Sequence, residues 1–180
     1  MHAIKLGIGI AWVVFWIYWL LAATQAKASV RSGWGFRARG IAAIAAIIMF
    51  RALRGHSVSV HTLALGIIGA ALFACGLLLA IWARLYLGSN WGMPTSQRVE
   101  PELVTSGPYR FVRHPIYSGL ILALIGTALA TSLYGLILVV IATAYFYWSA
   151  TVEERNLTQT FPSDYPEYES HTKKLIPFIL

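Results

Sequence analysis

The sequence predicts an all-α integral membrane protein: a helical bundle of about five transmembrane helices followed by an amphipathic, cytosolic C-terminal tail. Hydrophobic residues make up 58% of the 180 residues and charged residues only 12%. The mean hydropathy of +0.65 lies well above the range of soluble domains. Spans and short loops use most of the chain, so we expect residues 1–180 to form a single membrane-embedded domain.

The apolar runs predict spans at about residues 4–24, 40–53, 62–85, 115–130 and 133–151. The first run is too long for the apolar core of a typical signal peptide, so we interpret it as a span. The apolar run from Pro115 to Ala150 would make one helix of about 54 Å, too long for a single crossing of a bilayer about 30 Å thick. Thr131, Ser132 and Gly135 offer a turn that splits this run into two antiparallel helices.

Charge counting supports five crossings. It places eleven of the fourteen lysine and arginine residues on one side of the membrane, and Lys5, Arg51 and Arg54 on the other. The positive-inside rule then predicts an N-terminus outside and a C-terminus in the cytosol. It also explains the net charge of +7 without a nucleic-acid partner.

Small residues at helical spacing predict close helix packing. We expect Gly66, Ala70 and Ala74 of the third span, and Gly119 with Ala123 of the fourth, to allow neighbouring backbones to approach.

A polar and aromatic cluster marks the start of the fourth span, where residues 103–119 read LVTSGPYRFVRHPIYSG. Ionisable groups at the edge of a membrane are costly, which makes them functional candidates. Pro115 suits the first position of a helix, so His114 becomes the N-cap. The helix N-terminus and Arg113 favour an anion at this point. A plain interfacial belt of aromatic and basic residues is the alternative interpretation.

A second cluster, Glu153 and Glu154, follows the fifth span directly. A carboxylate pair at a helix C-terminus opposes the helix dipole, so we expect a partner cation, either a ligand ammonium or Arg113. A solvated tail with Arg155 as a local partner is the alternative. If residues 115–150 form a hairpin, the two clusters meet on the cytosolic face.

Other residues carry weaker signals. Lys173 and Lys174 are expected to contact lipid headgroups. His56 and His61 lack a third ligand, and Cys75 is the only cysteine, so we expect no metal site.

In residues 84–180 the chain resembles the isoprenylcysteine carboxyl methyltransferase family and its phospholipid-methyltransferase relatives. The Arg-His-Pro-x-Tyr core of residues 113–117, together with the downstream Glu153 and Glu154, is the most specific part of the resemblance. The other matching pieces are Gly88-Ser89-Asn90-Trp91, then Leu157, Phe161, Tyr165 and Tyr168, and finally Ile176-Pro177-Phe178.

The resemblance implies a membrane-embedded methyltransferase that uses S-adenosyl-L-methionine, with residues 84–180 as its cofactor-binding half. Carried onto this chain, the cofactor contacts are Gln97, Leu103, Val104, Tyr109, His114, Pro115, Ile116, Tyr117, Glu153 and Glu154. Arg113, His114 and Tyr117 are expected to position the reactants. Glu153 suits the ammonium of the ligand, and His114 with Arg113 suits its carboxylate. Tyr109 and Tyr117 suit the adenine ring or the sulfonium.

The methyl acceptor is expected to be lipophilic, with membrane lipids around it. A prenylated thiol-acid such as a prenylcysteine carboxylate, a lipid amine and a small thiol all remain open. In the prenylcysteine enzymes an arginine that holds the substrate carboxylate lies about one turn before the first glutamate, and Ser149 occupies that place here. Two other functions remain open: an NADPH-dependent membrane reductase of the sterol-reductase type, and a non-enzymatic membrane scaffold.

Overall fold

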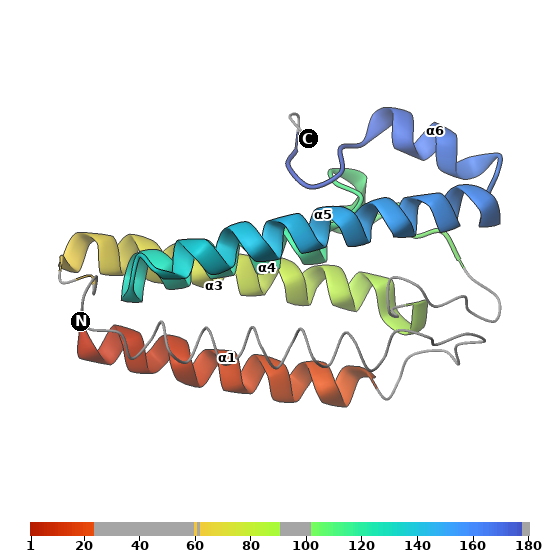
Figure 1. Cartoon of the computed structure of the whole chain (residues 1–180). Coiled ribbons are helices and arrows are strands. Elements are labelled where there is room, and N and C mark those ends of the chain that lie inside the picture. Colours follow the sequence, from red (N-terminus) through yellow and green to blue (C-terminus); the bar gives the residue numbers. More distant parts are fainter. Residues whose placement is uncertain (24–59, 61, 91–101, 178–180) are drawn as a thin grey trace.

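The computed structural model describes residues 1–23, 60, 62–90 and 102–177, and within these ranges the protein is all-helical (Figure 1). Its α-helices are α1 (His2–Ala23), α3 (Leu63–Leu87), α4 (Pro115–Thr131), α5 (Gly135–Thr160) and α6 (Asp164–His171). Two short 3₁₀ helices, η1 (Gly88–Asn90) and η2 (Gly107–Arg110), lie between α3 and α4. The predicted all-α class is confirmed.

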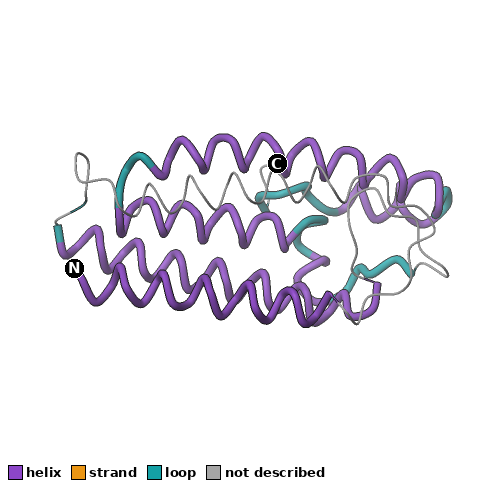
Figure 2. Tube along the Cα trace, turned by 60° about the horizontal axis from the view of Figure 1, so that its bottom comes forward, coloured by secondary structure: helices purple, strands orange, loops and turns teal. Residues whose placement is uncertain are grey.

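Three of the helices, α1, α3 and α5, are long and apolar enough to cross a membrane, and α4 is a shorter apolar helix of 17 residues. They agree with the predicted first, third, fifth and fourth spans. The predicted span at residues 40–53 lies outside the described residues. α1, α3 and α5 run in one direction and α4 runs in the other (Figures 1 and 2). Large apolar side chains such as Leu20, Leu78 and Val140 are exposed on the outer faces, as expected for a helix surface that meets lipid.

The predicted turn between the fourth and fifth spans is confirmed. α4 ends at Thr131, and the Gly135 backbone N–H donates to the Ser132 carbonyl at 2.9 Å to close the turn. Because α5 runs back along α4, the start of α4 lies beside the C-terminal half of α5. This hairpin is what places the two polar clusters together.

Among the described helices, α3 and α4 pack most closely, through small residues. A Cβ added at Gly119 would lie 2.6 Å from the Gly76 carbonyl oxygen, and one at Gly69 would lie 2.6 Å from the Gly126 carbonyl oxygen. Only glycine allows the two backbones to come this close.

The prediction for this packing was half right. Gly119 and Ala123 do face α3, but the α3 side of the seam is the face with Gly69, Gly76 and Ala80. On the predicted face, Ala74 is exposed and Gly66 packs against Met1 instead. α3 carries small residues on more than one face, so their spacing alone did not select the partner.

α5 continues two turns past the predicted end of the span. Glu153 and Glu154 therefore lie inside the helix, which ends at Thr160, and the expectation of a carboxylate pair at a helix C-terminus was wrong. The polar residues after the apolar part of α5 simply remain helical. Pro162 lies in the turn that follows, and Pro166 lies in the first turn of α6, where a missing N–H costs no hydrogen bond. α6 then doubles back along the end of α5 (Figure 1).

α1 is fixed to the bundle at two levels. The Trp12 indole N–H donates to the Thr127 hydroxyl of α4 at 3.1 Å. At the other end the buried Arg84 guanidinium donates to the Ala22 carbonyl at 2.7 Å and to the Gly88 carbonyl at 2.6 Å. One side chain thereby provides hydrogen-bond donors to a carbonyl group at the C-terminal end of α1 and to another at the C-terminal end of α3.

Candidate active site

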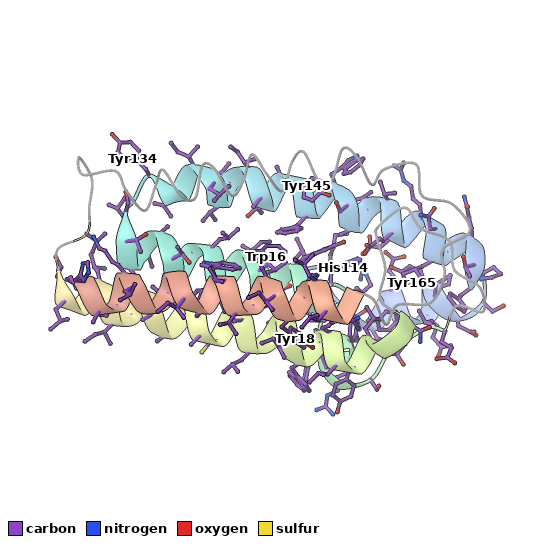
Figure 3. All side chains as sticks on the ribbon, turned by 90° about the horizontal axis from the view of Figure 1, so that it is seen from below. Trp16, Tyr18, His114, Tyr134, Tyr145 and Tyr165 are labelled. Carbon is purple, nitrogen blue, oxygen red and sulfur yellow. The ribbon has the colours of Figure 1, made fainter. Side chains whose placement is uncertain are left out.

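The two polar clusters meet at one end of the α4–α5 hairpin. His114 is the N-cap of α4, directly before Pro115 at the first helical position, as predicted. Its Nδ1 lies 3.2 Å from Glu153 Oε2, and its Nε2 lies 3.2 Å from Glu154 Oε1. In Figure 3, His114 lies toward the same end of the bundle as Tyr165, while Tyr134 marks the opposite end of α5. The predicted meeting of the imidazole and the carboxylates is confirmed.

The two neighbouring carboxylates favour the charged form of His114. The residue is buried, and burial alone lowers the pKa of an imidazole. Hydrogen bonds to Glu153 and Glu154, with the negative charge of both, outweigh burial and raise the pKa of His114 above its usual value. With each ring nitrogen facing a carboxylate, the imidazolium can donate in both directions.

Glu154 is the more enclosed of the two carboxylates, with only 9% of its side chain exposed. Its Oε1 accepts from Arg113 Nε at 2.7 Å and faces His114, while its Oε2 pairs with Lys174 Nζ at 2.8 Å. Burial by itself raises the pKa of Glu154, but the hydrogen bonds from His114, Lys174 and Arg113 lower it to about 2. The donors around Glu154 thus favour its ionised form.

Glu153, one residue earlier, has a more open environment, with 24% of its side chain exposed. It accepts a hydrogen bond from the Tyr117 hydroxyl at 2.7 Å and faces His114. A carboxylate has about four lone-pair positions, so these two partners leave acceptor capacity for a ligand donor.

An aromatic stack runs from the carboxylates along the hairpin. The His114 and Tyr117 rings are stacked with centroids 5.5 Å apart, and the Tyr117 and Phe146 rings follow at 4.8 Å. Phe146 was not predicted as a site residue, because its position about two turns before the glutamates has meaning only once α5 is known to pack on α4. The stack and Glu153 together form a surface that suits a cation or a flat ring.

Arg113, predicted to hold the anionic end of a ligand, has its guanidinium engaged by the protein. In addition to Glu154 it donates to the Thr172 carbonyl at 2.6 Å, and its Nη2 lies 3.3 Å from Glu169 Oε1. Its side chain is 9% exposed. Arg113 therefore links α5, α6 and the segment after α6.

The segment of residues 172–175, which we call the C-terminal strap, lies against the start of α4. Arg113 N donates to the Lys173 carbonyl at 2.8 Å, and His114 N donates to the Lys174 carbonyl at 3.1 Å. The expectation that Lys174 contacts lipid headgroups was wrong, because its ammonium pairs with Glu154. Its neighbour Lys173 is exposed.

The other predicted contacts surround this centre. Tyr109, Ile116 and Val104 pack together with Ala83 of α3, and the Tyr109 carbonyl accepts from the Tyr168 hydroxyl at 2.7 Å. Pro115 is fully buried, and Leu103 is half-buried in the segment before η2. Gln97 lies outside the described residues.

Ser149, at the position of the family's substrate arginine, is fully buried one turn before Glu153. Its hydroxyl has no hydrogen-bond partner within the described part of the chain. Across residues 1–23, 60, 62–90 and 102–177, no three His, Cys, Asp or Glu side chains gather closely enough to hold a metal ion.

Comparisons with known proteins connect this site to a family. The sequence profile of the family described as phospholipid methyltransferase matches residues 65–164, which include the whole α4–α5 hairpin. A cobalt-zinc-cadmium resistance protein, CzcN, of Cupriavidus metallidurans is 32% identical over 142 residues. That match covers 74% of this chain and 60% of the relative, so the chain spans somewhat over half of the relative's length.

A shorter sequence match and a solved structure both point to methyltransferases as well. Methanethiol S-methyltransferase 1 of Bradyrhizobium diazoefficiens is 35% identical over 78 residues, 43% of this chain and 27% of that enzyme. The structure of a eukaryotic intramembrane Ras methyltransferase, an isoprenylcysteine carboxyl methyltransferase, superposes with a TM-score of 0.60 at 25% identity. It covers 83% of this chain and 55% of that one. The resemblance predicted from the motifs is confirmed.

Proposed function

Because this chain belongs to the phospholipid methyltransferase family, we propose that it transfers a methyl group from S-adenosylmethionine to a lipophilic acceptor in the membrane. The observation that carries the proposal is the contact of His114 with both Glu153 and Glu154 beside a stack of aromatic rings. That contact joins the two motifs of the family at one place. We further propose that residues 84–180 form the cofactor-binding half of a single domain.

The residues present fit the polar end of this cofactor. Glu153 keeps free acceptor positions on a partly exposed carboxylate, which suits an α-ammonium group. The His114 imidazolium suits an α-carboxylate by charge alone, because both ring nitrogens face Glu153 and Glu154 while the positive charge lies at the N-terminus of α4, where the helix dipole adds to it. We assign these two contacts to Glu153 and His114.

We propose that the rest of the cofactor is enclosed by the less polar part of the predicted set. The ring edge and hydroxyl of Tyr117, next to Glu153, are proposed to contact the sulfonium or the adenine ring, because His114 and Phe146 stack on the two faces of the Tyr117 ring. Pro115, Ile116 and Tyr109 form the wall behind it, with Val104 and Leu103 on the approach from η2. Gln97 completes the proposed set.

When bound, S-adenosylmethionine supplies an activated methyl group on a positively charged sulfur. The protein's residues then act by position and by water exclusion rather than by proton transfer. The Tyr117 hydroxyl donates to Glu153, which fixes the carboxylate, and Phe146 covers the far side of the Tyr117 ring. The acceptor would reach this place sideways, from the lipid.

The same residues determine what each candidate acceptor would need. No cation occupies the position of Ser149, and Arg113 and Lys174 are paired with Glu154. A prenylcysteine carboxylate would therefore need another cation, whereas a small thiol or a lipid amine would need none. We retain all three as candidate acceptors, because the relatives are named for a thiol, an isoprenylcysteine carboxyl group and phospholipids.

We propose that this site faces the cytosol, with the N-terminus of the chain outside. The distribution of lysine and arginine supports this orientation. Reporter fusions that fluoresce only in the cytosol test it: a fusion at residue 180 should fluoresce, and a fusion at residue 1 should not. The reverse pattern would invert the proposed topology.

Calorimetric titration of the detergent-purified protein tests the proposed cofactor. We expect heat of binding with S-adenosylmethionine, at micromolar affinity, and none with NADPH. Heat with NADPH alone would identify a reductase, and no heat with either ligand would favour a scaffold. A transfer assay with methyl-labelled S-adenosylmethionine and a total membrane extract would then identify the labelled acceptor.

A further inference from the structure

We propose that Lys174 is a positioning residue of the cofactor site: it holds Glu154 in place, and through Glu154 it orients His114. The inference rests on the proposed cofactor function and deepens it. It separates the two neighbouring glutamates by role, with Glu153 facing the ligand and Glu154 facing the protein. It also makes the Lys174 side chain a part of the site.

The first observation is the pattern of contacts around Glu154. Both of its oxygens are occupied: Oε1 by Arg113 and His114, and Oε2 by Lys174. All three partners are donors, and the carboxylate is buried. Such a group has little capacity to accept from a ligand, but it fixes the imidazole that lies against it.

The second observation is a run of four carbonyl groups in the C-terminal strap. The carbonyl oxygens of residues 172–175 each accept a hydrogen bond from the segment that begins α4. In order, the donors are Arg113 Nη1 at 2.6 Å, Arg113 N at 2.8 Å, His114 N at 3.1 Å and Ser118 Oγ at 2.5 Å. Residues 113–118 therefore have their conformation set by a segment about 60 residues away in the chain.

The third observation is the position of the Lys174 side chain. Its ammonium lies 2.8 Å from Glu154 Oε2, 3.1 Å from the Thr151 hydroxyl and 4.7 Å from the centre of the Tyr147 ring. All three partners belong to α5. The side chain of Lys174 thus fastens the strap to α5, while the strap's backbone holds the start of α4.

These contacts have a consequence for the proposed ligand. If Lys174 is removed, Oε2 of Glu154 loses its donor in a buried place, and the carboxylate keeps only the contacts of Oε1 with Arg113 and His114. One of the two orienting partners of His114 is then held less firmly, while Glu153 and Tyr117 keep their own contact. Binding of the cofactor should weaken, but bound cofactor should still react.

The test compares Lys174→Met with Lys173→Met, which removes the exposed neighbouring ammonium and leaves the hydrophobic stem in place. In calorimetric titrations and transfer assays, Lys174→Met should raise the Kd and KM for S-adenosylmethionine about fivefold, with kcat within about twofold of the original chain. Lys173→Met should leave all three unchanged. Lys174→Arg, which keeps a donor and a charge, should restore the affinity.

Each other result is informative. A loss that is confined to kcat, with an unchanged KM, would mean only a smaller folded fraction and would overturn the inference. Equal affinities for Lys174→Met and Lys173→Met would overturn it as well. If Lys174→Met cannot be purified, Lys174→Gln takes its place under the same criteria. Failure of the original chain to bind S-adenosylmethionine would instead refute the proposed function itself.

Discussion

Replacing Glu153 by glutamine is the substitution that most sharply probes the ligand side of the site. Glutamine keeps the shape of the side chain and an oxygen that accepts from Tyr117, whose hydroxyl lies 2.7 Å away in the original chain. What is lost is the negative charge that we assign to the ligand's ammonium. Because 24% of the side chain is exposed, the substitution should leave the fold intact.

The expected loss follows from the type of contact removed. A hydrogen bond to a charged group contributes about 1.5–3 kcal/mol, which corresponds to roughly a 10- to 150-fold weaker affinity. We therefore expect Glu153→Gln to raise the Kd for S-adenosylmethionine by at least tenfold. Glu154→Gln should weaken binding less, since Glu154 acts through His114, but it should lower the melting temperature more because it leaves Arg113 and Lys174 without a buried counter-charge.

Calorimetric titration and thermal unfolding in the same detergent provide both readouts. Glu167→Gln, an exposed carboxylate of α6, is the matched control and should change neither. If Glu153→Gln binds S-adenosylmethionine as tightly as the original chain, Glu153 does not contact the ligand and our assignment of the two glutamates is wrong.

Three further predictions concern the fold and its pH dependence. Gly76→Val forces a side chain into the α3–α4 seam and should lower the free energy of unfolding by about 1–3 kcal/mol. Gly9→Val, where a Cβ meets nothing within 4 Å, should lower it little, and the melting temperatures of the two variants test this difference. Trp12→Phe loses a buried hydrogen bond to α4 and should cost about 0.5–1.5 kcal/mol, while Trp16→Phe on the exposed face should not; equal shifts would contradict this. The pKa of His114 is raised in the folded protein, so the stability gained from its charge is complete below pH 6.5 and is lost as the pH rises through the higher folded-state pKa. The melting temperature should therefore fall over that pH window. It should fall less in His114→Asn. A fall of the same size in both proteins would contradict the charged imidazolium.

The hairpin was predictable because length and local chemistry both determine it. The apolar run after Pro115 exceeds one bilayer crossing, and its only adjacent pair of Ser or Thr residues is Thr131 and Ser132. Once that turn is fixed, His114 on the α4 side and Glu153 on the α5 side lie at nearly equal distances from it along the chain. The two residues therefore lie at the same level of the hairpin. The pairing of the two motifs therefore follows from counting residues, and the structure agrees.

The strap was not predictable by the same means. Lys174 follows two prolines and a reversal of the chain, and nothing in its own neighbourhood distinguishes it from Lys173. Their different environments depend on where α6 docks, which is a tertiary contact. The prediction of the α3 face that meets α4 failed for a related reason. α3 has small residues on two faces, and only the shape of the partner helix selects between them.

A structure of the protein in complex with S-adenosylhomocysteine would test the central claim most directly. We predict that the ligand lies against the His114–Tyr117 stack, with its amino group within hydrogen-bond distance of Glu153 and its carboxylate facing His114. A ligand bound elsewhere in the bundle, or one in this place with no contact to either residue, would contradict the proposed site.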